Sequence, residues 1–213
     1  SRPVTDGHLQ GLTTTNASPY YNAAQFVMSK EHGVFVDDVP GIPLSISFWV
    51  YCEDPNLGYQ TFCSLTDYNR TTPVMQLDYD RGLNRFSLNF AVPDWWTTYY
   101  YTVTTNTWYH FVVTFDSNYQ VKYYINGALQ NTINGTSFDA GKGKSRICFG
   151  TNGDTGNRGF YGKLSDVRIY DICLRQDEIT TILGNTYRNL ILDSQVNTYN
   201  TPAQYLCNKT KRS

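Results

Sequence analysis

The chain has 213 residues, of which 17 are Lys or Arg and 18 are Asp or Glu, so its formal net charge is −1. So balanced a charge excludes a chain built to neutralise many phosphates, which argues against general nucleic-acid binding. Hydrophobic residues make up 40% and aromatic residues 15% of the chain, which excludes global disorder and favours β-structure. No apolar run is long enough to predict a membrane span.

Residues 1–24 are polar and rich in turn residues, and they predict a lead-in that holds one short strand. The chain starts at Ser1 without an initiator Met, so we expect a processed chain or a piece of a longer precursor. Two short apolar runs, Gln25–Met28 and Gly33–Val36, predict a hairpin. Leu44–Tyr51 alternates with a period of two, which predicts a strand with one apolar face.

Further strands are predicted at short, regular spacing along the chain, over residues 60–65, 74–80, 85–92, 99–104, 108–116, 120–125, 128–133, 145–150 and 162–170. The pair Asn126–Gly127 between two of them predicts a type I′ hairpin turn. In the strand 108–116, the face with Tyr109, Phe111, Val113 and Phe115 is expected to lie in the core. Many short strands with turns between them indicate a sandwich or jelly roll.

One helix is predicted, over Arg175–Leu183, with Gly184 as its C-cap, and Leu190–Leu192 is predicted as a last strand. The chain is therefore expected to divide into three parts. Residues 1–24 form an N-terminal lead-in or docking arm, residues 25–184 form the β-sandwich, and residues 185–213 form a C-terminal extension.

Three segments together resemble a known family: Leu44–Tyr51, then Asn106–Asp116 continuing through Val121–Gly127, then Phe160–Tyr170 followed by Leu174 and Asp177–Ile179. Their order and spacing are similar to the laminin-G-like, pentraxin-like branch of the concanavalin A-like lectin/glucanase superfamily, over residues 6–183. The resemblance implies an all-β fold, a two-sheet antiparallel jelly-roll sandwich with one short C-terminal helix. It says little about the ligand, because this fold hosts many functions.

Glucanases of this fold carry two Glu close together on one strand, and the three Glu of this chain lie far apart. Asp78 and Asp80 do share a strand face, but we interpret them as two solvent-facing carboxylates beside the Arg81–Gly82 turn. The chain also lacks the Gly-x-Ser-x-Gly elbow of serine hydrolases. The sequence therefore predicts no enzyme, and glycoside hydrolysis ranks third among the functions considered.

The resemblance also implies calcium, which many family members bind near a sheet edge through carbonyl and carboxylate oxygens. The corresponding ligands here are Asp6, Asp154 in the Gly-rich loop 151–159, and Asp166. One carboxylate of the family pattern is missing, because Ser165 precedes Asp166 where the family has two Asp. The alternative for the Gly-rich loop is a plain loop of turn residues.

The segment 94–101 packs five large aromatic residues into eight positions. Tyr and Trp stack on sugars and dominate protein interfaces. Trp95 and Trp96 are adjacent, so both cannot point inward along a strand. This segment is the leading candidate for ligand binding, through Asp94, Trp95, Trp96, Tyr99 and Tyr100. The alternative is that Tyr99 and Tyr101 belong to the core.

The chain has five cysteines. Cys52 and Cys63 flank one loop, and Cys148 and Cys173 follow late strands, so two disulfides are predicted, with Cys207 left over. The alternative is five reduced thiols in an intracellular protein. Glycosylation sequons occur at Asn16, Asn69, Asn134 and Asn208. Together with the cysteines they favour a secreted chain.

The function predicted from the sequence is a non-catalytic recognition module, outside the cell or on a particle surface, that binds a glycan or a protein through residues 94–101. The alternative is a structural subunit of an extracellular filament, sheath or viral fibre. In that case the terminal segments would dock onto neighbouring copies, as an added strand completes a sheet edge, and the chain would form a homo-oligomer.

Overall fold

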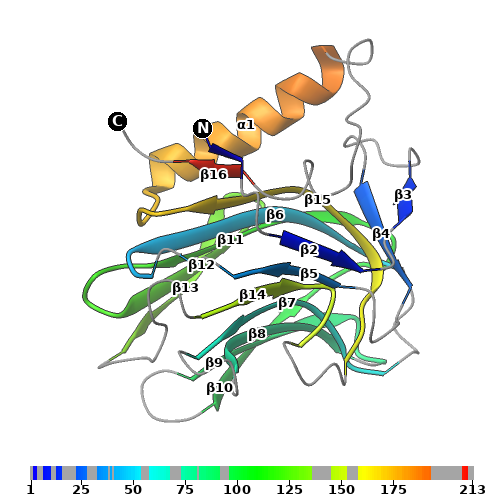
Figure 1. Ribbon diagram of the computed structural model, residues 1–213, viewed down its shortest axis with the longest axis horizontal. Coiled ribbons are helices and arrows are strands. Elements are labelled where there is room, and N and C mark those ends of the chain that lie inside the picture. The colour runs from blue at the N-terminus through cyan, green and yellow to red at the C-terminus, as the bar shows by residue number, and fades with distance from the viewer. Residues whose placement is uncertain are drawn as a thin grey trace.

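Two β-sheets packed face to face make up most of the molecule, with one helix above them (Figure 1). The computed structural model describes residues 2–3, 7–10, 13–15, 23–27, 33–37, 39, 41–53, 58–67, 73–80, 82–91, 96–135, 145–152, 158–192 and 208–210. The architecture confirms the predicted all-β sandwich of the concanavalin A-like, jelly-roll kind.

The upper layer in Figure 1 is a nine-stranded sheet with the order β1-β16-β15-β6-β11-β12-β13, to which β4 and β3 add beside β15. Its strands are β1 (Arg2–Pro3), β3 (Thr13–Thr15), β4 (Ala23–Val27), β6 (Leu44–Cys52), β11 (Trp108–Phe115), β12 (Gln120–Ile125), β13 (Ala128–Asn134), β15 (Tyr161–Tyr170) and β16 (Asn208–Thr210). The central pairings of β6 with β11 and β15 are antiparallel, whereas β16 runs parallel to β15.

The lower layer is a seven-stranded sheet with the order β10-β9-β8-β7-β14-β5-β2. Its strands are β2 (Gly7–Gln10), β5 (Gly33–Val36), β7 (Gln60–Thr66), β8 (Pro73–Asp80), β9 (Arg85–Ala91), β10 (Trp96–Thr102) and β14 (Ile147–Phe149). The strands β7 to β10 form an antiparallel meander, so equivalent positions on neighbouring strands face the same side of the sheet.

The core lies between the two sheets and is built largely from phenylalanine. Phe48 on β6 lies opposite Phe111 on β11, with ring centroids 5.6 Å apart, and contacts Phe62 of the other sheet at 5.9 Å. Phe111 and Val113 face this core, and Tyr109 packs at its margin, which confirms the predicted apolar face of the strand 108–116. Each fully buried Phe contributes roughly 1.5–3 kcal/mol by leaving water.

The helix α1 (Gln176–Leu192) covers the outer face of the nine-stranded sheet, as Figure 1 shows. Ile179 and Ile182 of the helix pack with Val112, Tyr124 and Tyr170 of the sheet in a second apolar cluster. The helix begins after Arg175 because the Glu178 carboxylate accepts the Arg175 backbone N–H at 2.9 Å, as in a capping box.

The helix is longer than predicted. It continues through Gly184 to Leu192, so Gly184 is an interior residue rather than a C-cap, and Leu190–Leu192 is helix rather than strand. A glycine near the end of an apolar periodic run predicts a helix end. Here the run of backbone hydrogen bonds continues beyond it.

The predicted hairpin of residues 25–36 is wrong. The strand β4 pairs with β15 and β3 in the nine-stranded sheet, whereas β5 pairs with β14 and β2 in the seven-stranded sheet. The lead-in also contains more than one short strand, since β1, β2 and β3 all lie within residues 1–24.

The predicted type I′ turn between β12 and β13 is confirmed, because Asn126 and Gly127 have φ of 51° and 80°.

Neither predicted disulfide is present. Cys52 and Cys63 both reach the core, but from opposite sheets, and both are free cysteines. Cys148 lies on β14 of the seven-stranded sheet, whereas Cys173 follows β15 of the other sheet beside α1. No disulfide therefore joins these four cysteines, and Cys207 lies outside the described residues.

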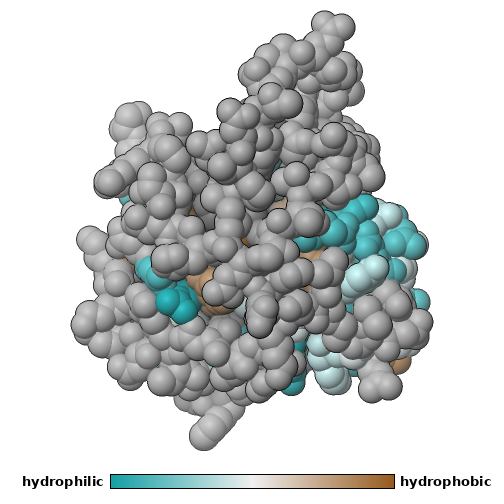
Figure 2. Space-filling view, turned by 45° about the vertical axis from the view of Figure 1, so that its right-hand side comes forward, coloured by the Kyte–Doolittle hydropathy of each residue, from teal (hydrophilic) through white to brown (hydrophobic). Residues whose placement is uncertain are grey.

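The described surface visible in Figure 2 is mainly hydrophilic, with only small apolar areas. This matches the inward orientation of the apolar side chains. No helix in the described part of the chain is long and apolar enough to cross a membrane.

Candidate functional site

The outer face of the seven-stranded sheet carries a cluster of polar side chains at matched positions. Gln76 of β8 lies opposite Asn89 of β9, which lies opposite Thr98 of β10. Two residues further along β8, Asp78 lies opposite Ser87 of β9, which lies opposite Tyr100 of β10. The alternate residues of these strands, such as Leu77 and Leu88, face the core, so the polar side chains must face away from it.

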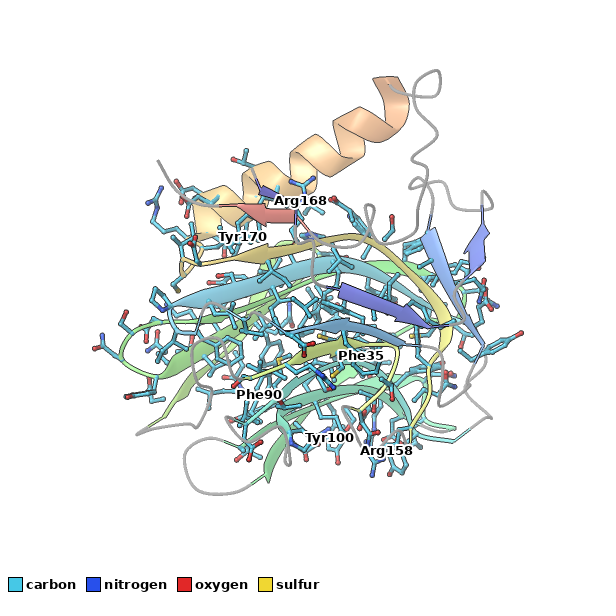
Figure 3. The ribbon with its side chains drawn as sticks, viewed as in Figure 1. Phe35, Phe90, Tyr100, Arg158, Arg168 and Tyr170 are labelled. Carbon is cyan, nitrogen blue, oxygen red and sulfur yellow. The ribbon has the colours of Figure 1, made fainter. Side chains whose placement is uncertain are left out.

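These side chains form a pocket with a volume of ≈ 400 Å³, which lies within the range of roughly 300–1,000 Å³ typical of ligand sites. In Figure 3 Tyr100 and Arg158 lie together on this side of the sheet. The pocket is lined by Tyr59, Gln76, Asp78, Ser87, Asn89, Thr98, Tyr100 and Arg158.

Asp78 is the charged centre of the pocket floor, and only 1% of its surface is exposed. Its Oδ1 accepts the Thr61 hydroxyl at 2.6 Å, and its Oδ2 accepts the Gln76 amide at 2.8 Å and Arg158 Nη1 at 3.0 Å. Burial raises the pKa of the Asp78 carboxyl, while the hydrogen bonds from Thr61 and Gln76 and the charge of Arg158 oppose the shift.

Asn89 forms the part of the pocket floor next to Asp78. Its amide nitrogen donates to the backbone oxygens of Gln76 and Ser87, each at 3.2 Å, and its Oδ1 accepts the Thr98 hydroxyl at 2.8 Å. These bonds link β8, β9 and β10 across the sheet surface. The floor is therefore a fixed arrangement of amide and hydroxyl groups.

Two tyrosines rise beside this floor, and each is stacked against an arginine. The Arg158 guanidinium lies 5.1 Å from the centre of the Tyr59 ring, and the Arg85 guanidinium lies 3.6 Å from the centre of the Tyr100 ring. Arg85 is held in turn by Asp80, with Nε and Oδ2 2.7 Å apart. Tyr59 and Tyr100 remain 49% and 56% exposed, so both rings are available to a ligand.

The interpretation of Asp78 and Asp80 as solvent-facing carboxylates is wrong. Both lie on the outer face of β8, yet they are 1% and 2% exposed. Each is covered by the arginine that pairs with it, Arg158 for Asp78 and Arg85 for Asp80. Because each carboxylate is paired with a separate arginine, the two do not form an open acidic pair.

Neighbouring side chains of the predicted binding segment 94–101 point to opposite faces of the sheet. Tyr100 lines the pocket, whereas Tyr99 points the other way and packs against Phe90 and Tyr123 in the core, at 6.4 and 6.0 Å between ring centroids. Trp96 is the first residue of β10, and its side chain is not described. Asp94 and Trp95 lie outside the described residues.

Of the three predicted calcium ligands, only Asp166 is described. Its Oδ1 accepts Arg168 Nε at 2.9 Å, beside the irregularity in the β15–β6 pairing. Asp6 and Asp154 lie outside the described residues. No group of three His, Cys, Asp or Glu side chains in the described part could hold a metal ion. Calcium therefore stays a prediction from the family resemblance.

Among the glycosylation sequons, Asn134 is exposed at the end of β13, where its Oδ1 accepts the Gln120 amide at 2.7 Å. Asn208 lies in β16, and Asn16 and Asn69 lie outside the described residues. Glycosylation at these positions stays a prediction.

His110 is the one histidine whose side chain is described, and it is fully buried on the outer face of β11. Its Nε2 lies 3.0 Å from the Ser47 hydroxyl. Burial lowers the pKa of His110 to about 4; the charge of Asp166 opposes this shift, and the charge of Arg168 adds to it. The ring is therefore neutral near pH 7 and serves packing within the sheet.

Sequence reasoning missed six lining residues of the pocket: Tyr59, Gln76, Ser87, Asn89, Thr98 and Arg158. A usable signal was present for the strand residues. Polar residues alternate with apolar ones along β8 and β9, which places a polar stripe on one face of the meander. No sequence signal brought Arg158 to this face, because it lies 80 positions from Asp78.

The comparisons with known proteins agree with this architecture. Residues 30–180 match the model of the Laminin_G_3 family, described as concanavalin A-like lectin/glucanases superfamily. None of the curated protein sequences compared with the chain matches it.

Solved structures share the fold at low sequence identity. One is domain 4 of AbnA, a GH43 extracellular arabinanase from Geobacillus stearothermophilus, in complex with arabinotriose. It has a TM-score of 0.63 and 20% identity, and the match covers 83% of this chain and 87% of that domain. Another is the botulinum neurotoxin type G receptor binding domain, with a TM-score of 0.62 and 14% identity.

The botulinum neurotoxin serotype D binding domain is similar at a TM-score of 0.63 and 17% identity. The matches to both toxin domains cover 84% of this chain but only 46% of theirs, so this chain corresponds to about half of each.

Proposed function

The chain belongs to the Laminin_G_3 family of the concanavalin A-like lectin/glucanases superfamily, and we propose that within it the chain is a non-catalytic carbohydrate-binding module. Its ligand occupies the pocket on the outer face of the seven-stranded sheet, between Tyr59 and Tyr100. Tyr100 therefore remains a binding residue, as the sequence predicts for the segment 94–101. The centre of the site lies on β8 and β9.

The observation that carries the proposal is the pairing of two half-exposed tyrosine rings with a fixed polar floor in one pocket of ≈ 400 Å³. A sugar presents apolar C–H faces and a rim of hydroxyls. The rings offer surfaces on which the C–H faces stack, and the Gln76 side-chain oxygen and the hydroxyls of Ser87 and Thr98 match the hydroxyls of the sugar. The arabinotriose complex of a domain with the same fold supports this ligand class.

A glycan fits the pocket better than a protein partner does. Specific protein interfaces bury about 800 Å² on each partner and have an apolar centre. The pocket is concave and its floor is hydrophilic. Ligand pockets of this size instead enclose a small molecule or a short stretch of a polymer.

We also propose that the pocket binds saccharides without hydrolysing them. Glycoside hydrolases need two carboxyl groups across the scissile bond, about 5–10 Å apart. Among the described residues, Asp78 is the only carboxylate that lines the pocket, and Arg158 neutralises it. Asp80 is paired with Arg85 and does not line the pocket.

The structural-subunit alternative has less support. The terminal strands β1 and β16 pair with each other, and β16 pairs with β15 of the same chain. On β13, at the edge of the nine-stranded sheet, Asn131 Oδ1 accepts the Thr132 N–H at 2.8 Å. Side chains that occupy backbone groups in this way disfavour strand addition.

A location outside the cell is also part of the proposal. The sequons and the likeness to a domain of an extracellular arabinanase support it. The absence of a disulfide among the four described cysteines adds no support. Detection of N-linked glycan at Asn134 in chain purified from a eukaryotic secretory host would test whether this sequon is used.

The test is a glycan array probed with the full chain and with Tyr59→Ala and Tyr100→Ala. Leu129→Ala is the matched control, because Leu129 is 47% exposed on β13, in the other sheet. Binding of at least one saccharide by the wild type and the control, with loss in both tyrosine variants, is the expected result. Binding that both tyrosine variants retain would refute the pocket, and hydrolysis of the bound saccharide would refute the non-catalytic role.

A further inference from the structure

The pocket contains one negative and one positive side chain in direct contact. Asp78 Oδ2 and Arg158 Nη1 are 3.0 Å apart, and no other charged side chain lines the pocket in the described part of the chain. The nearby cation Arg85 is paired with Asp80 at 2.7 Å. Each arginine in this region is therefore matched by its own aspartate, and the pocket has no net charge.

An anionic ligand group would enter this pocket without a free cation to receive it. The carboxylate of Asp78 is 1% exposed and cannot move away from the floor, because Thr61 and Gln76 hold it together with Arg158. A second carboxylate placed against Arg158 would lie close to Asp78 and lose part of its water. A ligand hydroxyl in the same position carries no charge and is not repelled by Asp78.

The unused hydrogen-bonding groups of the pocket suit hydroxyls. Among the described residues, none bonds to the Gln76 side-chain oxygen or the Ser87 hydroxyl. One group only accepts a hydrogen bond, and the other both donates and accepts. Arg158 keeps further N–H groups beyond the one that binds Asp78. A polyhydroxylated ligand, whose groups both donate and accept, satisfies all three.

From these contacts we infer that the pocket selects uncharged saccharides and discriminates against acidic ones, and that the Asp78–Arg158 pair sets this selectivity. The inference rests on the proposed saccharide-binding function. Asp78 excludes the ligand's negative charge, and Arg158 compensates Asp78 so that the floor remains stable without a bound cation.

The probe is an array that carries each uronic acid oligosaccharide in two forms, the free acid and its methyl ester. The array also carries the neutral hexose oligosaccharide of the same linkage. The ester keeps the ring and the linkage and removes the charge. The full chain is expected to bind the neutral and esterified forms at least about tenfold more tightly than the free acid.

Two variants assign the effect to the pair. Asp78→Asn keeps the shape and leaves Arg158 uncompensated, so the preference against the free acid is expected to disappear or reverse. Arg158→Gln leaves Asp78 uncompensated, and the preference is expected to increase. Thermal unfolding of both variants identifies any loss of folding, and the ratio of acid to ester binding is compared only between folded proteins.

The outcomes separate the two proposals. Binding of the free acid as tight as, or tighter than, that of its ester by the wild type overturns the selectivity and leaves the saccharide site intact. An unchanged ratio in folded Asp78→Asn also overturns it. Absence of binding to every form, neutral or acidic, overturns the proposed function and the selectivity with it.

Discussion

Arg158 and Asp78 lie 80 residues apart in the chain, and their side chains meet at 3.0 Å on the outer face of the seven-stranded sheet. The contact connects the segment that precedes β15 to the centre of β8. Arg158 also stacks on Tyr59, so one side chain links the charged floor of the pocket to one of its aromatic walls.

Substitution of Tyr100 separates ring stacking from hydrogen bonding. Tyr100→Ala should weaken binding of an array-positive saccharide by about tenfold, because it removes one aromatic wall. Tyr100→Phe keeps the ring and should retain most of the affinity. Isothermal titration of the three proteins measures the difference. Equal losses in both variants would show that the hydroxyl, not the ring, holds the ligand.

Gly184→Ala should stabilise the chain by about 0.5–1 kcal/mol, because Gly184 is an exposed interior residue of α1 and alanine favours helix. A Cβ at this position meets no atom within 4 Å. The unfolding midpoint in urea measures the change. A decrease in stability would mean that Gly184 ends the helix as a left-handed C-cap, as the sequence first predicted.

Gly162→Ala should destabilise the chain by about 3 kcal/mol or more, because the added methyl group would collide with a neighbouring strand. Its Cβ would overlap the backbone oxygen of Tyr51 and lie 2.6 Å from Cζ of Phe160. The backbone of β6 cannot move without breaking its pairing with β15. Gly184→Ala is the control in the same urea series, and a Gly162→Ala protein as stable as wild type would contradict this packing.

The stability of the chain should fall as the pH decreases from about 6.5 to about 4, because of His110. Its pKa is lowered from 6.5 to about 4 by burial, so in this range the unfolded chain binds a proton that the folded chain refuses. The full effect is about 3 kcal/mol, present above pH 6.5 and lost below pH 4.

The measurement compares urea unfolding of wild type and His110→Gln across this pH range. Glutamine does not titrate, so the difference in stability between the two proteins should change with pH. Burial raises the pKa of Asp78, which gives a pH dependence of opposite sign, but that contribution is common to both proteins and cancels in the difference. A difference independent of pH would contradict the buried, neutral His110.

The sequence predicted strands well and their partners poorly. The period of two in Leu44–Tyr51 and in residues 108–116 identified strands and their core face, because alternation is a local property. The hairpin of residues 25–36 failed for the opposite reason. Two apolar runs joined by a short turn indicate a hairpin, yet β4 and β5 cross to different sheets, and which sheet each joins depends on distant strands.

The candidate site was only partly predictable. Tyr100 was identified from its aromatic segment, but its neighbour Tyr99 faces the core, and only the register of β10 decides which of the two is exposed. The sequence alone indicates a surface carboxylate at Asp78, because a polar residue on an outer face is normally solvated. Its burial comes from Arg158, whose position follows from the folding of the whole chain.

The most direct test of the account is a crystal structure of the chain with an array-positive oligosaccharide. The expected result is a saccharide in the pocket, with a ring against Tyr59 or Tyr100 and hydroxyls within hydrogen-bond distance of the Gln76, Ser87 or Arg158 side chains. A saccharide held elsewhere, with this pocket empty, would contradict the account.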